Sequence, residues 1–332
     1  MSRGDGKLAL NALHHDSRGL IWGYRLADCT PIGLEDVDAG TLSSPVWFHF
    51  NLSDGRARKW LSEHAQLPPA ALALLLDPQA RVRLQQLPEA VVATIADLHH
   101  DFHGDPEGFG DVRLYVDAGR VISARRHPLK TVDVLHRGVE QGQGFPSTSS
   151  WLERFVEGLA GSFGEVVTDL IDQVDELEDE IVIGTNKEQR ARLAALRRLL
   201  VRFRRHLHAD RGALSHLRSF VTQDGAQQLN PLRQALEHLD GVASDLDLIH
   251  ERVRLLQEEV ANLLAEATNR NLYVLSVVTT VLLPATLLTG LWGMNVGGLP
   301  WAEDPHGMWW SGMTVVLSIL FSLALLRGSR VL

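Results

Sequence analysis

Two kinds of hydrophobic pattern divide the chain near residue 128. Before it, short apolar runs of alternating or β-branched character are separated by Gly, Pro and Asp, which predicts strands with helices between them. We expect strands at 19–26, 46–52, 82–87, 90–98, 112–116 and 121–126, and helices at 57–66 and 70–76. Residues 1–128 are therefore expected to form an α/β domain. It should include a hairpin between Arg113 and Ala124, because Asp117 to Gly119 separate two apolar runs.

After residue 128, apolar side chains recur every three or four positions, which is typical of amphipathic helices. One run covers 152–181 and a second covers 193–207, with a short turn after Gly184 between them. A turn of this length predicts that the two helices pack antiparallel. A third helix is expected to begin near Asn230 and Pro231, since Asn favours the position before a helix and Pro its first turn.

The third helix carries a sustained heptad pattern. Its apolar positions from Val242 to Ala267 alternate spacings of four and three residues. No Pro or Gly occurs between Val242 and Pro284, so this helix should continue into the apolar segment that follows as one rod of about 60 residues and 90 Å.

Two uncharged apolar segments close the chain. Residues 272–292 and 308–326 contain no Asp, Glu, Lys or Arg, and each would form a helix about 30 Å long, the thickness of a bilayer's hydrocarbon core. The sequence thus predicts an α+β membrane protein whose long helical stalk is continuous with the first of two C-terminal transmembrane helices. The expected segments are a cytoplasmic α/β domain (1–128), a helical stalk (129–271), the first transmembrane helix (272–293), a periplasmic loop (294–307), the second transmembrane helix (308–326) and a tail (327–332).

The charges that flank these spans predict their orientation. Arg270 precedes the first span and Arg327 and Arg330 follow the second, whereas the connecting loop contains Glu303 and Asp304 and no Lys or Arg. By the positive-inside rule both termini are cytoplasmic and the loop lies outside. A hairpin of two helices cannot enclose a hydrated path, so transport would require several copies around an axis.

Small and polar residues of the first span fall on one helical face. Steps of three and four residues give Asn269, Leu272, Ser276, Thr279, Leu283, Thr286 and Gly290. Two interpretations remain open: the face packs against another helix, as small residues do in membranes, or it lines a pore. Because the face has no charge, a permeating cation would keep much of its water.

Composition removes several classes of protein. The single cysteine, Cys29, excludes an intramolecular disulfide framework and a cysteine-based zinc ribbon. The formal net charge of -9 disfavours nucleic acid as a partner. We find no glycine-rich phosphate loop and no Ser/His/Asp set, so we expect no enzyme and no prosthetic group.

At the outer end of the first span stand Gly293, Met294 and Asn295, followed by Val-Gly-Gly-Leu-Pro over 296–300. The glycines would end the helix and expose its backbone, and the Asn amide offers a neutral oxygen acceptor. With the long helix ahead and a second span behind, the chain resembles the CorA superfamily of divalent-cation transporters. Within it, this segment and the loop from Trp301 to Gly307 look most like the ZntB zinc-transporter branch.

The resemblance implies a homopentameric funnel in the bacterial inner membrane, with the first span lining the pore and a ring of Gly293, Met294 and Asn295 at the periplasmic entrance. It implies Zn²⁺ as the transported ion, with Mg²⁺, Co²⁺, Ni²⁺ and Cd²⁺ as further candidates. Magnesium-type members often carry an acidic residue where Trp301 follows Pro300 here. This departure favours the zinc branch.

The loop carries three polar side chains with two interpretations each. In a pentamer Glu303 and Asp304 would form an anionic ring that concentrates cations, or they are solvated residues of a turn. His306 could bind zinc or titrate near neutral pH and couple transport to protons, or it is an interfacial side chain.

Charge is also segregated in the stalk. Residues 165–180 carry eight acidic and no basic side chains, whereas residues 187–211 carry nine basic and two acidic ones. The two helices could pair with each other. Alternatively, the basic helix lies near the pore exit or the lipid headgroups and modulates cation flux.

His99, His100 and His103 are the densest cluster of metal-ligand residue types. They could form a regulatory zinc site, since neutral imidazoles suit zinc, or a polar loop between strands.

Two other functions remain as alternatives at this point. One is a Mg²⁺/Co²⁺/Ni²⁺ channel of the same fold. The other is a membrane-anchored signalling coiled coil without a pore, which would be dimeric.

Overall fold

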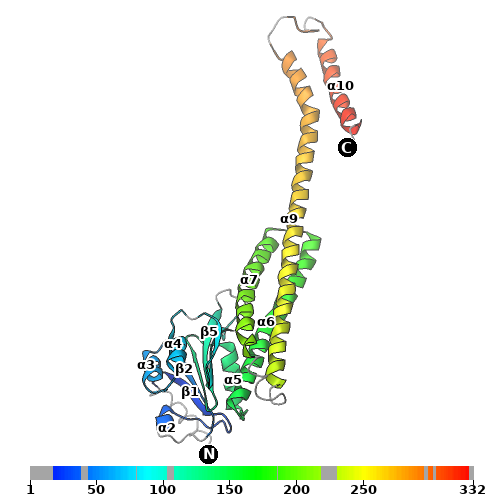
Figure 1. The fold of residues 1–332 in the computed structure, drawn as a ribbon. Coiled ribbons are helices and arrows are strands. Elements are labelled where there is room, and N and C mark those ends of the chain that lie inside the picture. The colour runs from blue at the N-terminus through cyan, green and yellow to red at the C-terminus, as the bar shows by residue number, and fades with distance from the viewer. Residues whose placement is uncertain are drawn as a thin grey trace, which may run out of the picture. The chain divides into compact units, whose positions relative to one another are not determined.

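The chain forms two compact units, Met1–Leu256 and Gln257–Leu332. The computed structural model describes residues 18–38, 44–79, 81–102, 108–184, 186–217, 230–294, 298–301 and 304–328. Helix α9 (Asn230–Trp292) is one continuous helix that belongs to both units and contains Pro284 (Figure 1). The predicted continuity of the third helix with the first apolar span is therefore confirmed. The finer division of the sequence into six segments stays a prediction.

A six-stranded sheet organises the first unit. Its strands are β1 (Leu20–Arg25), β2 (Val46–Asn51), β3 (Arg83–Gln86), β4 (Ala90–Leu98), β5 (Phe109–Asp117) and β6 (Arg120–Arg125). The spatial order is β1-β2-β6-β5-β4-β3, and only β2 and β6 are parallel. All six predicted strands are present, and the predicted hairpin pairs Arg113 with Ala124. Its turn is fixed by the Asp117 carboxylate, which accepts from the backbone N–H groups of Gly119 and Arg120 at 2.9 Å.

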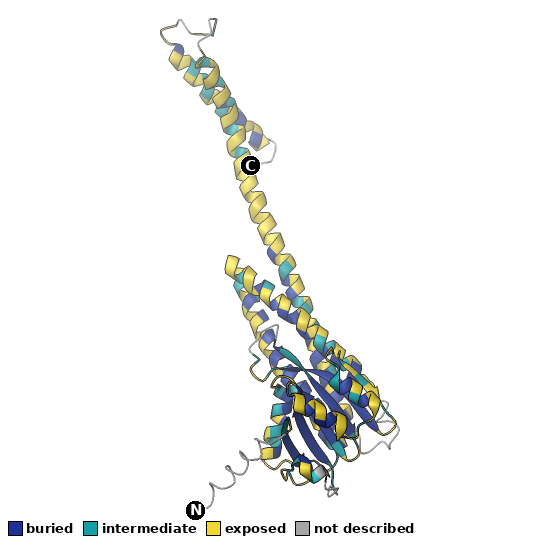
Figure 2. Cartoon of the chain, turned by 90° about the vertical axis from the view of Figure 1, so that its left-hand side faces the viewer, coloured by how far each residue is buried: buried dark blue, intermediate teal, exposed yellow. Residues whose placement is uncertain are grey.

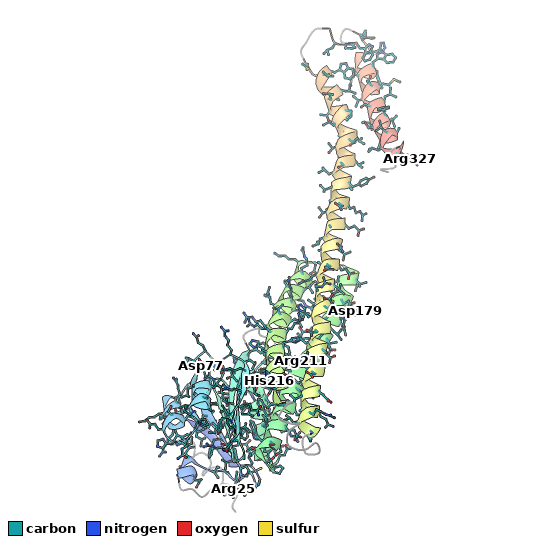
Figure 3. All side chains as sticks on the ribbon, in the orientation of Figure 1. Arg25, Asp77, Asp179, Arg211, His216 and Arg327 are labelled. Atoms are coloured by element: carbon teal, nitrogen blue, oxygen red, sulfur yellow. The ribbon has the colours of Figure 1, made fainter. Side chains whose placement is uncertain are left out.

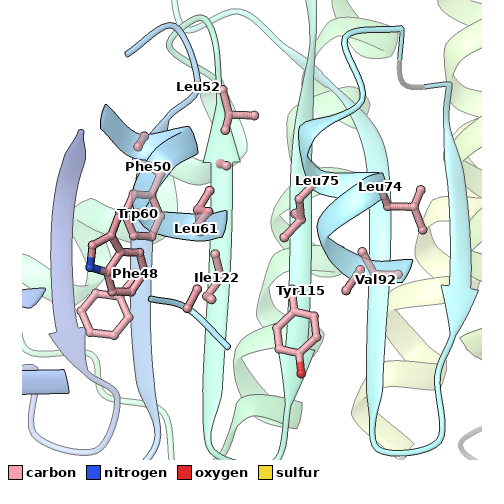
Figure 4. Close-up of a cluster of buried hydrophobic side chains, with 14 of the residues drawn as sticks. Phe48, Phe50, Leu52, Trp60, Leu61, Leu74, Leu75, Val92, Tyr115 and Ile122 are labelled. Atoms are coloured by element: carbon pink, nitrogen blue, oxygen red, sulfur yellow. The ribbon is translucent and has the colours of Figure 1, made fainter. Parts of the chain in front are cut away.

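One face of the sheet is covered by two short helices, α3 (Gly55–Glu63) and α4 (Pro69–Leu76). Asp54 caps α3 by accepting from the Arg56 backbone N–H at 2.8 Å, and Pro69 stands at the first position of α4, where its missing N–H costs nothing. Between helices and strands lies a core that includes Phe50 and Tyr115 (Figure 4). A further short helix, α2 (Leu34–Asp38), contributes Leu34 to this core.

The other face of the sheet packs against α5 (Lys130–Glu140) and α6 (Thr148–Ile183). The rings of Trp47 on β2 and Trp151 on α6 have centroids 5.2 Å apart, and Trp22 on β1 stacks on His136 of α5 at 3.9 Å. Helix α5 was not predicted from the sequence. Its buried side chains nevertheless repeat at helical spacing: Val132, Leu135 and Val139.

Helices α6, α7 (Lys187–Ser215) and the first part of α9 bury one apolar seam each. Asn186 caps α7 by accepting from the backbone N–H groups of Glu188 and Gln189. On α9 the heptad seam is buried as far as Val260, whereas Leu263 is 38% exposed. Beyond it, every residue from 261 to 276 is exposed (Figure 2).

Ion pairs connect the three helices. Arg192 of α7 reaches Glu176 at 3.0 Å and Glu180 at 2.8 Å on α6, so the interpretation that the acidic and basic helices pair with each other is confirmed at this end. Other pairs tie α9 to its neighbours: Arg252 to Asp175 and Glu178 of α6, Arg204 to Asp247, and Arg211, which is labelled in Figure 3, to Asp240.

Candidate functional site

Two helices of the chain are long and apolar enough to cross a membrane, the later part of α9 and α10 (Gly307–Gly328). Their most apolar windows have mean hydropathies of 2.0 and 1.8, and only 6% and 11% of these windows is buried. An apolar surface of this size is not stable against water. The second unit therefore needs lipid or further copies of the chain around it.

The polar face of α9 is open along its whole length. The positions predicted to line a pore, Asn269, Leu272, Ser276, Thr279, Leu283, Thr286 and Gly290, are all exposed. The hydroxyls of Thr279 and Thr286 donate to the carbonyl oxygens of Leu275 and Leu282, both at 2.8 Å. Each hydroxyl oxygen thus keeps lone pairs that point away from the helix backbone. The structure brings these side chains together as one neutral, oxygen-bearing stripe.

The opposite face of α9 packs against α10. Both views of the chain show α10 beside this part of α9 (Figures 1 and 2). Ala285 is only 7% exposed, and the half-buried positions share its face: Val277, Val281, Pro284, Leu288 and Trp292. Leu283 on the polar stripe lies two residues from both Val281 and Ala285, which is about 200° around a helix. The second span of the same chain therefore leaves the polar stripe uncovered.

Helix α10 uses its own hydroxyl residues for this contact. Small and hydroxyl residues recur every three or four positions on its less exposed face, at Gly307, Ser311, Thr314, Ser318 and Ser322. The apolar Val315, Ile319 and Leu326 are half-buried or buried beside them. Small residues let two helix backbones approach closely in a membrane. This stripe was not predicted from the sequence, although the spacing of its residues in 307–322 indicates it. Packing within the chain thus explains the small residues of α10 but not those of α9.

Helix α9 ends at Trp292 and is followed by Gly293 and Met294. The Gly293 backbone N–H donates to the carbonyl oxygens of Thr289 at 3.0 Å and Gly290 at 3.2 Å, and Met294 is 52% exposed. The Trp292 indole N–H donates to the Pro300 carbonyl at 3.3 Å and its ring stacks on Trp301 at 6.1 Å. The chain after the helix is thereby folded back onto the helix end. Asn295, the third residue of the predicted entrance motif, lies outside the described residues.

In the loop, Asp304 and His306 lie side by side. The Asp304 carboxylate accepts from the His306 backbone N–H at 2.8 Å and is 3.7 Å from His306 Nδ1. Both side chains are largely exposed, 40% and 77%. A carboxylate and an imidazole at this spacing can act together on a cation or a proton. Glu303 lies outside the described residues.

Two histidines of the predicted cytoplasmic zinc site, His99 and His100, contact different residues. His100 Nδ1 is 3.0 Å from Asp133 of α5, and the His99 ring is 5.3 Å from that of His127. His103 lies outside the described residues. Where the structure describes the chain, no group of three His, Cys, Asp or Glu side chains is placed to hold a metal ion.

Two carboxyl groups are fully buried where the sheet meets α5 and α7. Asp97, near the end of β4, accepts from the Leu98 N–H and the Thr131 hydroxyl at 2.8 Å and from the Thr131 N–H at 3.1 Å. Burial raises the pKa of Asp97 to about 7 despite these hydrogen bonds. Asp210 of α7 accepts from the Ala96 N–H at 2.8 Å, and its Oδ2 has no hydrogen-bond partner in the described part of the chain. Burial, and then the nearby charge of Asp97, raise the pKa of Asp210 well above its usual range.

A family model described as CorA-like Mg²⁺ transporter protein matches residues 43–327. The chain belongs to the CorA family. The resemblance inferred from residues 293–300 and the predicted fold class are thereby confirmed.

Curated relatives in the CorA family align over nearly their whole length. The divalent cation transporter CmaX of Pseudomonas aeruginosa is 32% identical over 305 residues, which cover 89% of this chain and 91% of CmaX. The zinc transport protein ZntB of Pectobacterium atrosepticum is 26% identical over 308 residues, 91% of this chain and 92% of ZntB.

Solved structures of the CorA family share the fold. Full-length CmaX superposes with a TM-score of 0.80 at 29% identity and covers 95% of this chain and 99% of its own. The CorA magnesium transporter of Methanocaldococcus jannaschii reaches a TM-score of 0.70 at 19% identity, over 85% of this chain and 90% of its own, which is a likeness of fold alone.

Proposed function

We propose that this CorA-family protein transports a divalent cation across a membrane, with Zn²⁺ as its cargo. The observation that carries the proposal is the polar stripe of α9 from Asn269 to Gly290, which is exposed and lies opposite the face covered by α10. Repeated around an axis, this stripe would line a pore with hydroxyl and amide oxygens.

The assembly proposed for this pore is a homopentamer. All residues from 261 to 276 of α9 are exposed, and a single helix cannot enclose a hydrated path. Further copies of α9 would cover the apolar flanks of the stripe. Fivefold symmetry comes from the resemblance to the CorA superfamily.

The chemistry of the stripe suits a cation that stays hydrated. Neutral hydroxyls return less free energy than the complete dehydration of a divalent cation costs, so the ion would pass with most of its first-shell water. The exposed residues Gly293 and Met294, together with Asn295, would form the outer entrance of the pore. Asp304 and Glu303 would concentrate cations there, and His306 would bind zinc or carry a proton.

The orientation proposed is a multi-pass protein of the bacterial inner membrane with both termini cytoplasmic. Arg270 and Arg327 flank the two spans on one side, and Lys and Arg are retained on the cytoplasmic side. The opposite ends carry Trp292, Trp301, Trp309 and Trp310. Indole rings gather at the membrane–water interface, so these four support the same placement of the loop.

Zinc and magnesium uptake into proteoliposomes tests the cargo. We expect saturable Zn²⁺ uptake by the full-length protein and little Mg²⁺ uptake. The alternative of a Mg²⁺/Co²⁺/Ni²⁺ channel draws on the family description, which names Mg²⁺. Saturable Mg²⁺ uptake without Zn²⁺ uptake would overturn the zinc assignment, and absence of any divalent flux would overturn transport itself.

The same vesicles test proton coupling. Zn²⁺ uptake is expected to increase when a pH gradient is imposed and to fall when an ionophore abolishes it. If the uptake rate is the same in both conditions, coupling is wrong and His306 loses its proposed role.

A further inference from the structure

The outer faces of α6 and α7 carry stripes of opposite charge, and most of these side chains make no ion pair within the described part of the chain. On α6 the stripe consists of Glu165, Asp169 and Asp172, and on α7 it consists of Arg198, Arg202 and Arg205; all six are exposed. We name these the acidic stripe and the basic stripe. Each repeats at spacings of three and four residues, so its members lie on one helical face.

Four of these six side chains have no partner in the chain as far as it is described. Asp169, Asp172, Arg198 and Arg205 make no hydrogen bond or ion pair there. Their neighbours on the inner flanks are used: Arg192 binds Glu176 and Glu180, and Arg204 binds Asp247 of α9. Glu165 is held by Lys130 at 2.7 Å and is still 70% exposed.

The two stripes face away from the helices that their own chain provides. Asp172 is two residues from the buried Val174, and Arg198 is two residues from the buried Leu200. Two residues correspond to about 200° around a helix. Each charged stripe therefore points outward while the apolar seams of α6 and α7 point inward, so the stripes cannot pair within one copy.

The ion pairs of Arg192 show which residues of the two antiparallel helices are level. Arg192 reaches both Glu176 and Glu180, so it is level with the turn between them. Six residues further along α7 stands Arg198, and six residues back from the middle of that turn stands Asp172. By the same count Arg202 is level with Asp169 to within one residue, and Arg205 is level with Glu165.

We propose that the acidic stripe of one copy docks against the basic stripe of a second copy. In a ring whose axis runs along α6 and α7, copies are related by rotation, so level residues stay level and the two helices stay antiparallel. Asp172 then faces Arg198 of the partner subunit, and the remaining members of the stripes pair in order. A contact between two different faces of the same chain is heterologous, and its repetition gives a ring when the rotation between copies closes.

The ion pairs between the two stripes determine the register of the contact more than its affinity. Exposed ion pairs contribute only about 0.2–1 kcal/mol each, whereas like charges brought together are clearly unfavourable. Small side chains flank the basic stripe, Ala194, Ala195 and Ala209, and leave room for the other helix to approach. The inference rests on the proposed function only in that copies must assemble.

Cysteine cross-linking of the full-length protein in membranes tests the contact. In a Cys29→Ser background, Asp172→Cys with Arg198→Cys should give covalent dimers and higher species on oxidation or with a short bis-maleimide. The matched control is Asp179→Cys with Arg198→Cys. Asp179 is also exposed on α6 (Figure 3), but it lies two turns, about 10.5 Å, from the level of Arg198's proposed partner. We expect a yield about tenfold lower for this pair.

Each single-cysteine variant should stay monomeric on a denaturing gel, because a heterologous contact does not place a residue against itself. Charge reversal gives a second measurement: Asp172→Arg or Arg198→Asp alone should weaken the assembly seen by light scattering, and the two together should restore it. Assembly without cross-links in the Asp172/Arg198 pair, or equal yields for the control pair, would overturn the contact and leave transport standing. A monomeric protein would overturn both, and loss of Zn²⁺ uptake despite cross-linking would overturn only transport.

Discussion

Replacing Thr286 with leucine is expected to lower divalent-cation uptake about tenfold or more, since a barrier increase of about 1.4 kcal/mol suffices for that factor. Thr286 lies near the C-terminal end of the polar stripe of α9, and its hydroxyl is held to the helix by a 2.8 Å hydrogen bond to the Leu282 carbonyl. In the proposed pore, its free lone pairs would accept hydrogen bonds from the water around a passing ion. Leucine removes this acceptor and adds bulk, and in an assembly every copy carries the change.

Thr289 provides a matched control on the same helix. It is exposed like Thr286, and its hydroxyl donates to the Thr286 carbonyl at 3.0 Å. Three residues separate the two, but Thr289 falls off the stripe defined by Leu283, Thr286 and Gly290. Thr289→Leu should leave uptake within about twofold of the unmodified protein. Equal losses in both variants would mean that α9 is sensitive to any substitution, and unchanged uptake in Thr286→Leu would mean that the stripe does not line the path.

Most of the fold could be predicted from periodic patterns of apolar residues in the sequence. The strands of the first unit alternate or run as short apolar segments, because one or both faces of the sheet are covered, and all six were located from this signal. The long helix was predictable because its seam from Val242 onward keeps the heptad spacing until the uncharged span begins. Helix α5 was not predicted because it is short and begins soon after Pro128, so its segment contains few helical turns.

These patterns do not predict contacts between distant segments of the chain. The spacing of Ser276 and Thr279 gives one helical face but does not tell which other helix covers it, and only the position of α10 shows that the face remains open within the chain. The hydroxyl stripe of α10 has the same spacing as that of α9 and a different use. Asp97 lies near the end of the long apolar strand β4, and nothing in its own segment indicates that Thr131 and Asp210 lie near it.

Raising the pH from about 5 to 8 is expected to destabilise the first unit. The folded state holds Asp97 with a pKa of about 7, above its usual value of 3.8, and raises that of Asp210 in the same direction. A carboxyl group with a raised folded-state pKa binds more protons when folded, so the free energy of unfolding falls as pH rises from about 4 through that pKa. For Asp97 the full window corresponds to a loss of about 4 kcal/mol.

Asp210→Asn should remove part of this pH dependence. The asparagine Oδ1 can still accept from the Ala96 N–H, and the neutral amide takes the place of a protonated carboxyl group. At pH 8 the variant has no carboxyl group whose burial disfavours ionisation, and Oδ2 of Asp210 has no hydrogen-bond partner where the chain is described. Its apparent melting midpoint should therefore lie about 5–10 °C above that of the unmodified protein. At pH 5 the two midpoints should agree closely.

Thermal unfolding of the full-length protein in detergent, followed by tryptophan fluorescence, measures this difference. The buried indoles of Trp47 and Trp151 report on the first unit. Asp179→Asn is the control, because that carboxylate is exposed on α6 and its loss should leave the pH profile unchanged. A midpoint that rises between pH 5 and 8 in the unmodified protein, or an Asp210→Asn variant that is less stable at both pH values, would show that the two carboxyl groups are ionised in the folded state at neutral pH and that their hydrogen bonds outweigh their burial.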